Sequence, residues 1–141
     1  MNKLDLSALY KANAALERAL GVMNDQQSAP RRNTAEVETL RAGVIQCFEF
    51  TYELCWKFIR RWLELNLGAA YIEGVPRREL FRHAAEYHLI DDVDTWMEYH
   101  EARNATAHTY DEENAEEIFQ IATPFLADAK SLLTALEQRN D

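Results

Sequence analysis

The longest regular pattern in the chain has the period of an α-helix and runs from Asn33 to about Leu67. Asn33 and Glu36 have the spacing of a capping box, which marks where a helix begins. The recurring stripe consists of Val37, Leu40, Val44, Cys47, Phe48, Thr51, Leu54, Cys55, Phe58, Ile59 and Trp62. Because Phe50 and Trp56 lie off this stripe, we expect the helix to be covered on two sides. Such a helix fits the centre of a bundle, or a bundle helix with an added dimer contact.

Helical patterns also precede and follow this segment. Residues 4–23 place apolar side chains with the helical period, and Asp5 or Ser7 is in position to cap that helix. Gly68 is expected to end the long helix, because glycine readily adopts the backbone conformation of a helix C-terminus. A shorter helix is predicted over residues 77–87, directly after a proline.

The C-terminal half adds two more helices. Asp91 or Asp92 caps the first of them, which ends in the stretch 101–111. Asp111 caps the last helix, and Pro124 is expected to kink or restart it. No stretch shows the alternation of a β-strand, so the chain is predicted to be all-α.

The length and the charge narrow the class of protein. A chain of 141 residues can build its own core, and we expect residues 1–141 to form a single domain. No apolar run approaches the roughly 20 residues that cross a bilayer, so no membrane span is predicted. The first residues lack the order of a secretory signal peptide, which indicates a cytoplasmic protein. A net charge of −9 argues against a general nucleic-acid coat.

The charges are nevertheless unevenly distributed. The basic residues of the middle are Lys57, Arg60, Arg61, Arg77, Arg78 and Arg82. The acidic residues around Arg103 are Asp91, Asp92, Asp94, Glu98, Glu101, Asp111, Glu112, Glu113, Glu116 and Glu117. One interpretation is that the acidic half docks a basic partner and the basic middle holds a phosphate-bearing one. The other is that both sets are solvated helix faces.

The cysteines and histidines do not suggest a metal site. Cys47 and Cys55 lie eight residues apart on one predicted helix, about 12 Å along its axis, which is too far for a disulfide. We expect both to be buried thiols. His83 and His88 are five positions apart and do not share a helix face, and no Cys/His spacing suggests zinc. We predict neither a metal nor a cofactor.

The richest chemistry lies in the stretch 101–111. Arg103, Asn104, His108 and Tyr110 fall within eight positions at the end of a predicted helix. Arginine binds phosphate with two parallel hydrogen bonds, and histidine transfers protons near neutral pH. RNA cleavage needs a base for the 2′-hydroxyl, an acid for the leaving oxygen and a cation for the extra phosphorane charge. These residues can supply all three without a metal.

Helical geometry limits how these residues meet. On a continuing helix Arg103 and His108 would point roughly 140° apart. They can reach one ligand if the helix unwinds near Thr106, or if two subunits share a pocket. Asn104 and His108 would share a face, with His100 one turn earlier. The structural alternative is a helix end where His108 caps carbonyls and Arg103 pairs with acidic side chains, and spacing alone favours it.

Glu49, Glu53 and Lys57 form a charged line along the long helix. Their spacing of four residues predicts pairing within that helix. Alternatively, they support the site by holding Arg103 from a facing helix.

Four segments give the chain a resemblance to a known family. They are 48–57 (FEFTYELCWK), 76–79 (PRRE), 89–92 (LIDD) and 103–111 (RNATAHTYD), which together span roughly residues 32–120. In their order and spacing the chain resembles the HEPN superfamily, specifically its HepT-like group of nucleotidyltransferase substrate-binding proteins.

This resemblance implies a fold and an activity. The fold would be an antiparallel up-down four-helix bundle with an additional short helix, assembled as a homodimer. In the family, an Arg-x4-His-x-Tyr motif is associated with metal-independent RNA cleavage by a toxin, and it maps onto Arg103, His108 and Tyr110 with Asn104 as the polar neighbour. The resemblance also implies a partner, a minimal nucleotidyltransferase encoded nearby, which in such family members acts as antitoxin by transferring AMP to the motif tyrosine. Tyr110 occupies that position.

Three hypotheses follow. The first is an endoribonuclease toxin of a toxin–antitoxin pair, with catalytic Arg103, His108 and Asn104, silenced by AMPylation of Tyr110. The second is a non-catalytic subunit that binds a substrate or nucleotide for a two-component nucleotidyltransferase. The third is a purely structural helical dimer.

Overall fold

The computed structural model describes residues 4–27, 34–108 and 112–140. Its elements are α1 (Ser7–Gln27), α2 (Thr34–Leu67), α3 (Ala69–Ile72), α4 (Arg77–Glu86), α5 (Val93–Ala105), the 3₁₀ turn η1 (Thr106–His108) and α6 (Glu112–Gln138). These described segments contain helices and turns but no β-strand, which confirms the all-α prediction. Among them, no helix combines the length and the apolar character that crossing a membrane requires.

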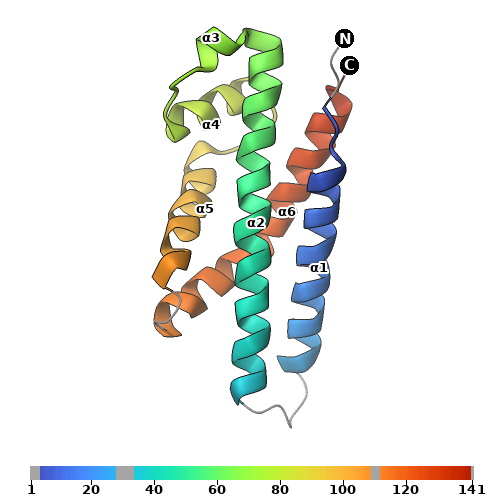
Figure 1. Ribbon diagram of the computed structural model, residues 1–141, viewed down its shortest axis with the longest axis vertical. Helices are drawn as coiled ribbons and strands as arrows, with labels where there is room; N and C mark the ends of the chain where they lie inside the picture. The colour runs from blue at the N-terminus through green and yellow to red at the C-terminus, as the bar shows by residue number, and fades with distance from the viewer. Residues whose placement is uncertain (1–3, 28–33, 109–111, 141) are drawn as a thin grey trace.

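The four long helices form an antiparallel up-and-down bundle (Figure 1). α1, α2, α5 and α6 alternate in direction, and the short helices α3 and α4 lie at the end where the chain termini meet (Figure 1). At that end the backbone amide of Leu4 donates to Oδ1 of Asn140 over 2.9 Å, and Nδ2 of Asn140 donates to the Leu4 carbonyl over 2.9 Å. The bundle predicted with an additional short helix is therefore present.

An aromatic cluster fills the middle of the bundle. The ring of Phe125 from α6 is fully buried and meets the rings of Phe48, Tyr99 and Trp96 edge-on, at centroid distances of 4.9, 5.0 and 5.9 Å. Edge-to-face contacts of this kind are favourable beyond the area that they bury. The cluster joins α2, α5 and α6, and so fixes the positions of the helices that carry the candidate site.

Local sequence explains where the short helices begin and end. Gly68, with a φ of 100°, separates α2 from α3, and Pro76 precedes the first residue of α4. Asp92 is the N-cap of α5, where its carboxylate accepts from the Asp94 amide over 3.2 Å. The end of α4 is closed by His88, whose φ is 62°. These boundaries agree with the sequence prediction, since glycine, proline and aspartate occur where helix ends require them.

Several predicted boundaries differ from the structure. α1 continues to Gln27, beyond the predicted end at residue 23, and the one-turn helix α3 was not predicted. Of the two caps predicted for α1, Asp5 is the one observed, because its carboxylate accepts from the Ser7 amide over 3.0 Å. α6 runs through Pro124 without restarting, although its ribbon changes direction along its length (Figure 1). The predicted caps Asn33 and Asp111 lie outside the described residues.

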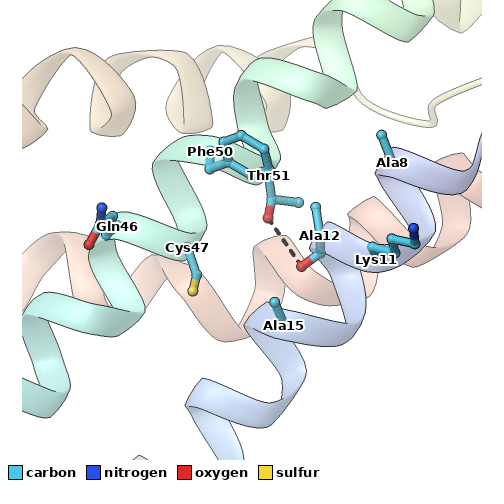
Figure 2. Close-up of a pocket in the computed structure, with 8 residues that line it drawn as sticks. All are labelled: Ala8, Lys11, Ala12, Ala15, Gln46, Cys47, Phe50 and Thr51. Carbon is cyan, nitrogen blue, oxygen red and sulfur yellow. Dashed lines mark hydrogen bonds between the residues drawn. The ribbon is translucent and has the colours of Figure 1, made fainter.

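The two cysteines are free thiols, but only one is buried as expected. Cys55 is fully buried, and this burial raises the pKa of its thiol well above the ordinary value. Cys47 is half-buried instead, because it lines an open groove of about 500 Å³ between α1 and α2. Figure 2 shows this groove, in which the Thr51 hydroxyl donates to the Ala12 carbonyl over 3.4 Å. The exposed ring of Phe50 also borders it. Of the two residues off the main stripe, Trp56 is partly buried against the core, whereas Phe50 is open in the described chain.

Candidate functional site

The candidate site is built on the last turn of α5, which carries Arg103 and Asn104. The α-helix ends at Ala105 and gives way to the 3₁₀ turn that runs to His108. The α-helical geometry that would point Arg103 and His108 apart therefore ends next to Thr106. The side chain of His108, and Tyr110 as a whole, lie outside the described residues.

Arg103 is held by two carboxylates of the neighbouring helix α2. Its Nη2 lies 3.4 Å from Oε1 of Glu49, and its Nε lies 3.1 Å from Oε1 of Glu53. Nε is buried and has no hydrogen-bond acceptor at a suitable angle, so its contact with Glu53 is electrostatic. Of the two alternatives for the charged line of α2, the contact with a facing arginine is the one observed for both glutamates. The third member of the charged line, Lys57, instead lies near Trp56, with Nζ 5.8 Å from the centre of the ring.

Polar side chains also close the end of α5. The Thr106 hydroxyl donates to the Arg103 carbonyl over 2.7 Å and accepts from Nη1 of Arg103 over 3.3 Å. From α6, Nδ2 of Asn114 donates to the Ala105 carbonyl over 2.9 Å. Carbonyl groups at a helix end lack partners within the helix, and these two side chains supply them. The contact with Thr106 also restrains the guanidinium of Arg103.

A second set of polar residues reaches Asn104 from the interior. Nη1 of Arg77 donates to the Tyr52 hydroxyl over 2.9 Å, and that hydroxyl lies 2.9 Å from Nδ1 of His100. Nε2 of the same histidine lies 3.4 Å from Nδ2 of Asn104. Helix periodicity had placed His100 one turn before Asn104, but neither Tyr52 nor Arg77 was predicted as part of the site. Both come from other helices, α2 and α4.

The same arginine connects to Arg103 by another route. The guanidinium of Arg77 lies over the Trp56 ring, 3.8 Å from its centre, which is a close cation–π contact. Nε1 of Trp56 donates to Oε2 of Glu53 over 3.0 Å, and Glu53 contacts Arg103. Arg77 therefore lies at the meeting point of two chains of contacts, one that ends at Asn104 and one that ends at Arg103.

Burial tunes the titrating groups of this network. Loss of solvent is the main cause that raises the pKa of the Tyr52 phenol far above its ordinary value, against the opposing effect of Arg77. Loss of solvent, assisted by the positive charge of Arg77, lowers the pKa of His100 below its ordinary value. Both groups are therefore neutral at pH 7, so the network contains a phenol and a neutral imidazole.

Several charges outside the site are neutralised by neighbours. In the basic middle, Arg78 pairs with Asp94 over 3.0 Å and Arg82 with Glu79 over 2.6 Å. Nε of Arg60 lies 3.5 Å from Oε1 of Glu64. These observations favour solvated, paired helix faces for that region. Among the described residues, no group of three or more His, Cys, Asp or Glu side chains is arranged to hold a metal ion.

Comparison with known proteins identifies the family. The profile of the family described as "Nucleotidyltransferase substrate binding protein like" matches residues 4–138. The chain belongs to this family. Its resemblance to the HepT-like group, predicted from four short segments, is thereby confirmed. A relative in Haemophilus influenzae (strain ATCC 51907 / DSM 11121 / KW20 / Rd), named "Probable ribonuclease HepT", is 34% identical over 140 residues, which cover 99% of this chain and 96% of the relative.

Two solved structures resemble this member of the family. One is a Haemophilus influenzae protein whose structure was described as the fold of a substrate binding domain of a nucleotidyltransferase. It is 32% identical, with a TM-score of 0.90 over 95% of this chain and 100% of that one. The other is a Thermus thermophilus protein, 26% identical, with a TM-score of 0.63 over 86% of this chain and 98% of that one.

Proposed function

We propose that this protein is a HepT-like toxin, a metal-independent endoribonuclease that a partner minimal nucleotidyltransferase neutralises by adenylylating Tyr110. The observation that carries the proposal is the end of α5, where Arg103 and Asn104 precede a 3₁₀ turn that leads to His108. The relative named as a ribonuclease, which aligns over almost the whole chain, supports the same activity.

The proposed residues suit the two proton transfers of RNA cleavage. The 2′-oxygen attacks the adjacent phosphorus while its proton passes to a base, and the 5′-oxygen leaves as it takes up a proton from an acid. His108 would act as that acid or base. Arg103 would bind the phosphate and stabilise the negative charge that develops on it, and Asn104 would orient it by donating from its amide. The products would be a 2′,3′-cyclic phosphate and a free 5′-hydroxyl.

The contacts of Arg103 bear on how RNA would bind. Glu49 and Glu53 lie against the guanidinium, so an incoming phosphate must compete with two carboxylates for it. Both glutamates thus have a supporting role, in that they hold Arg103 in place and keep its charge balanced until substrate arrives. Lys57, exposed on the same helix and close to Trp56, would contribute only a positive charge at the rim.

Adenylylation would silence such a site by charge and bulk. The Tyr110 oxygen would attack the α-phosphorus of ATP, a new O–P bond would form, and pyrophosphate would leave. A nucleotide attached two residues after His108 would fill the space that the RNA needs and would repel its phosphates. The family description, which refers to a nucleotidyltransferase, supports a partner of this kind.

A second candidate function is a non-catalytic subunit that binds a substrate or nucleotide for the same transferase. The family description and the Haemophilus structure described as a substrate binding domain favour it. In this case Arg103 would hold a nucleotide phosphate that is never cleaved. We further propose a single-domain homodimer in the cytoplasm. The exposed ring of Phe50 beside the α1–α2 groove is one surface where a second copy would find apolar contact.

The test is to express the protein with and without the neighbouring nucleotidyltransferase, measure its intact mass and assay each sample on RNA. The toxin hypothesis predicts one or more added AMP units that are lost in Tyr110→Phe, with cleavage only by unmodified protein. Arg103→Ala and His108→Ala should abolish cleavage and relieve any growth arrest. No added mass and no cleavage would favour the binding subunit, for which expression alone is harmless. A structural dimer predicts that His108→Ala is silent in every assay.

A further inference from the structure

The hydrogen bonds between Arg77 and Asn104 have a defined direction. A guanidinium only donates, so the Tyr52 oxygen accepts from Nη1 of Arg77 over 2.9 Å. The hydrogen of the Tyr52 hydroxyl is then free for its other neighbour, Nδ1 of His100, also at 2.9 Å. Nη1 of Arg77 itself lies 3.4 Å from the same ring nitrogen. Two donors therefore face Nδ1, and both are satisfied when Nδ1 is the unprotonated nitrogen of the ring.

That tautomer of His100 in turn determines the orientation of the Asn104 amide. A neutral imidazole with a bare Nδ1 carries its hydrogen on Nε2. Nε2 lies 3.4 Å from the Asn104 amide, at the position taken by Nδ2. Two donors do not bond to each other, whereas rotation of the amide by 180° brings its oxygen to that position as an acceptor. The NH₂ group of Asn104 is then turned away from the ring as a free donor.

We propose that Tyr52, Arg77 and His100 are positioning residues that hold the Asn104 amide with its NH₂ presented to the substrate phosphate. This inference deepens the proposed ribonuclease function and rests on it for the identity of the substrate. Tyr52 is fully buried and Asn104 is exposed, so the orientation is transmitted from the core to the surface. Without the chain of hydrogen bonds, an exposed amide would rotate freely and present either end.

Arg77 also links this orientation to the phosphate-binding arginine. Its guanidinium stacks on Trp56 at 3.8 Å, and Trp56 donates to Glu53, which contacts Arg103. The charged groups that bear on His100 are Arg77 from α4, Glu53 from α2, and Glu101 and Arg103 from its own helix. The Arg77 guanidinium approaches Nδ1, so its charge adds to the effect of burial in opposing protonation there.

The experiment compares Tyr52→Phe with a matched control, Tyr99→Phe. Tyr99 is also a buried tyrosine, but its hydroxyl donates to Asp128, away from the site. Two quantities are measured: the nitrogen chemical shifts of the His100 ring in the free protein, which report its tautomer, and the kcat and KM of RNA cleavage. The assignment of His100 is checked with His100→Gln.

We expect wild-type His100 to be the Nε2–H tautomer, and Tyr52→Phe to convert it to a mixture. We also expect kcat to fall about tenfold, the effect of one lost neutral hydrogen bond. Tyr99→Phe should leave the tautomer and kcat unchanged. Asn104→Asp should keep the tautomer of His100 but abolish RNA cleavage. An Nδ1–H tautomer in the wild type, or full activity with an unchanged tautomer in Tyr52→Phe, would overturn the proposal. The tautomer of His100 is measured without RNA. A wild type that cleaves no RNA would therefore refute the proposed ribonuclease function, while the tautomer measurement would still decide whether Tyr52 positions His100.

Discussion

Arg103 of α5 and Glu53 of α2 are in contact across the bundle, with 3.1 Å between Nε and Oε1. Glu49, one turn earlier on α2, approaches the same guanidinium at 3.4 Å. The cation proposed to bind phosphate is thus shared between two carboxylates in the free protein. Since the side chain of Arg103 is 28% exposed, part of it remains accessible to a ligand. The carboxylates can therefore both orient the arginine and weaken its attraction for phosphate.

We predict that Glu53→Gln strengthens RNA binding by about threefold to fivefold, because a partly exposed ion pair is worth up to about 1 kcal/mol. Fluorescence anisotropy with a labelled 2′-O-methyl RNA, which cannot be cleaved, measures the dissociation constant. Glu64→Gln is the matched control, since it removes the same charge from α2 at a glutamate that contacts Arg60 instead. Weaker binding by Glu53→Gln would mean that the carboxylate acts by orienting Arg103.

His100 should make the stability of the protein depend on pH. Burial, followed by the charge of Arg77, lowers its pKa in the folded state, whereas the unfolded chain has the ordinary value of about 6.5. Below that pH the unfolded state binds a proton that the folded state resists. The contribution of His100 is therefore complete above about pH 6.5 and is lost as the pH falls towards the folded pKa. Urea unfolding between about pH 5 and 8 measures the free energy of unfolding, which should fall less towards low pH for His100→Gln than for the wild type. Identical declines would show that His100 does not contribute.

The helices could be predicted because their signals are local. Gly68, Pro76 and Asp92 each act within one or two residues of a helix end, and the apolar stripe of α2 repeats along the chain. The one-turn helix α3 has too few residues for a periodic pattern, which explains why it was missed. Pro124 is also a local signal, and of its two expected effects, a kink or a restart, the restart is absent because α6 continues through it. One proline removes a single backbone hydrogen bond, which packing on both sides of it can outweigh.

The site could be predicted only where its residues are close in sequence or paired by charge. Arg103 and Asn104 were found from one stretch, and the acidic line of α2 suggested a partner for the arginine. The Arg77–Tyr52–His100 network joins three helices, so no spacing along the chain reveals it. One signal was available, because Tyr52 lies in the buried segment of α2 and a buried phenol needs a hydrogen-bond partner.

The aromatic cluster should dominate the stability of the bundle. Phe125 is fully buried among rings from α2 and α5, so Phe125→Ala is predicted to lower the free energy of unfolding by about 3–5 kcal/mol. Phe50→Ala is the same substitution at a ring that is 62% exposed. It should alter the free energy of unfolding of the monomer by less than about 0.5 kcal/mol. Urea titration at two protein concentrations measures both. A loss in Phe50→Ala that depends on concentration would instead place Phe50 in a dimer contact.

The end of α4 offers a stabilising substitution. His88 has a φ of 62°, and its amide donates to the Ala85 carbonyl over 3.1 Å while the Leu89 amide donates to the Ala84 carbonyl over 2.9 Å. These two bonds form a Schellman motif, in which the residue with positive φ is usually glycine. Histidine in this conformation is strained by its Cβ, whereas glycine is not, although glycine loses more entropy on folding.

The net prediction is that His88→Gly raises the free energy of unfolding by about 0.5–1 kcal/mol. Ala85→Gly, inside the same helix, should lower it by about 1 kcal/mol. Denaturant unfolding of the three proteins in one buffer distinguishes these outcomes. A destabilised His88→Gly would show that the imidazole makes a contact worth more than the strain it causes.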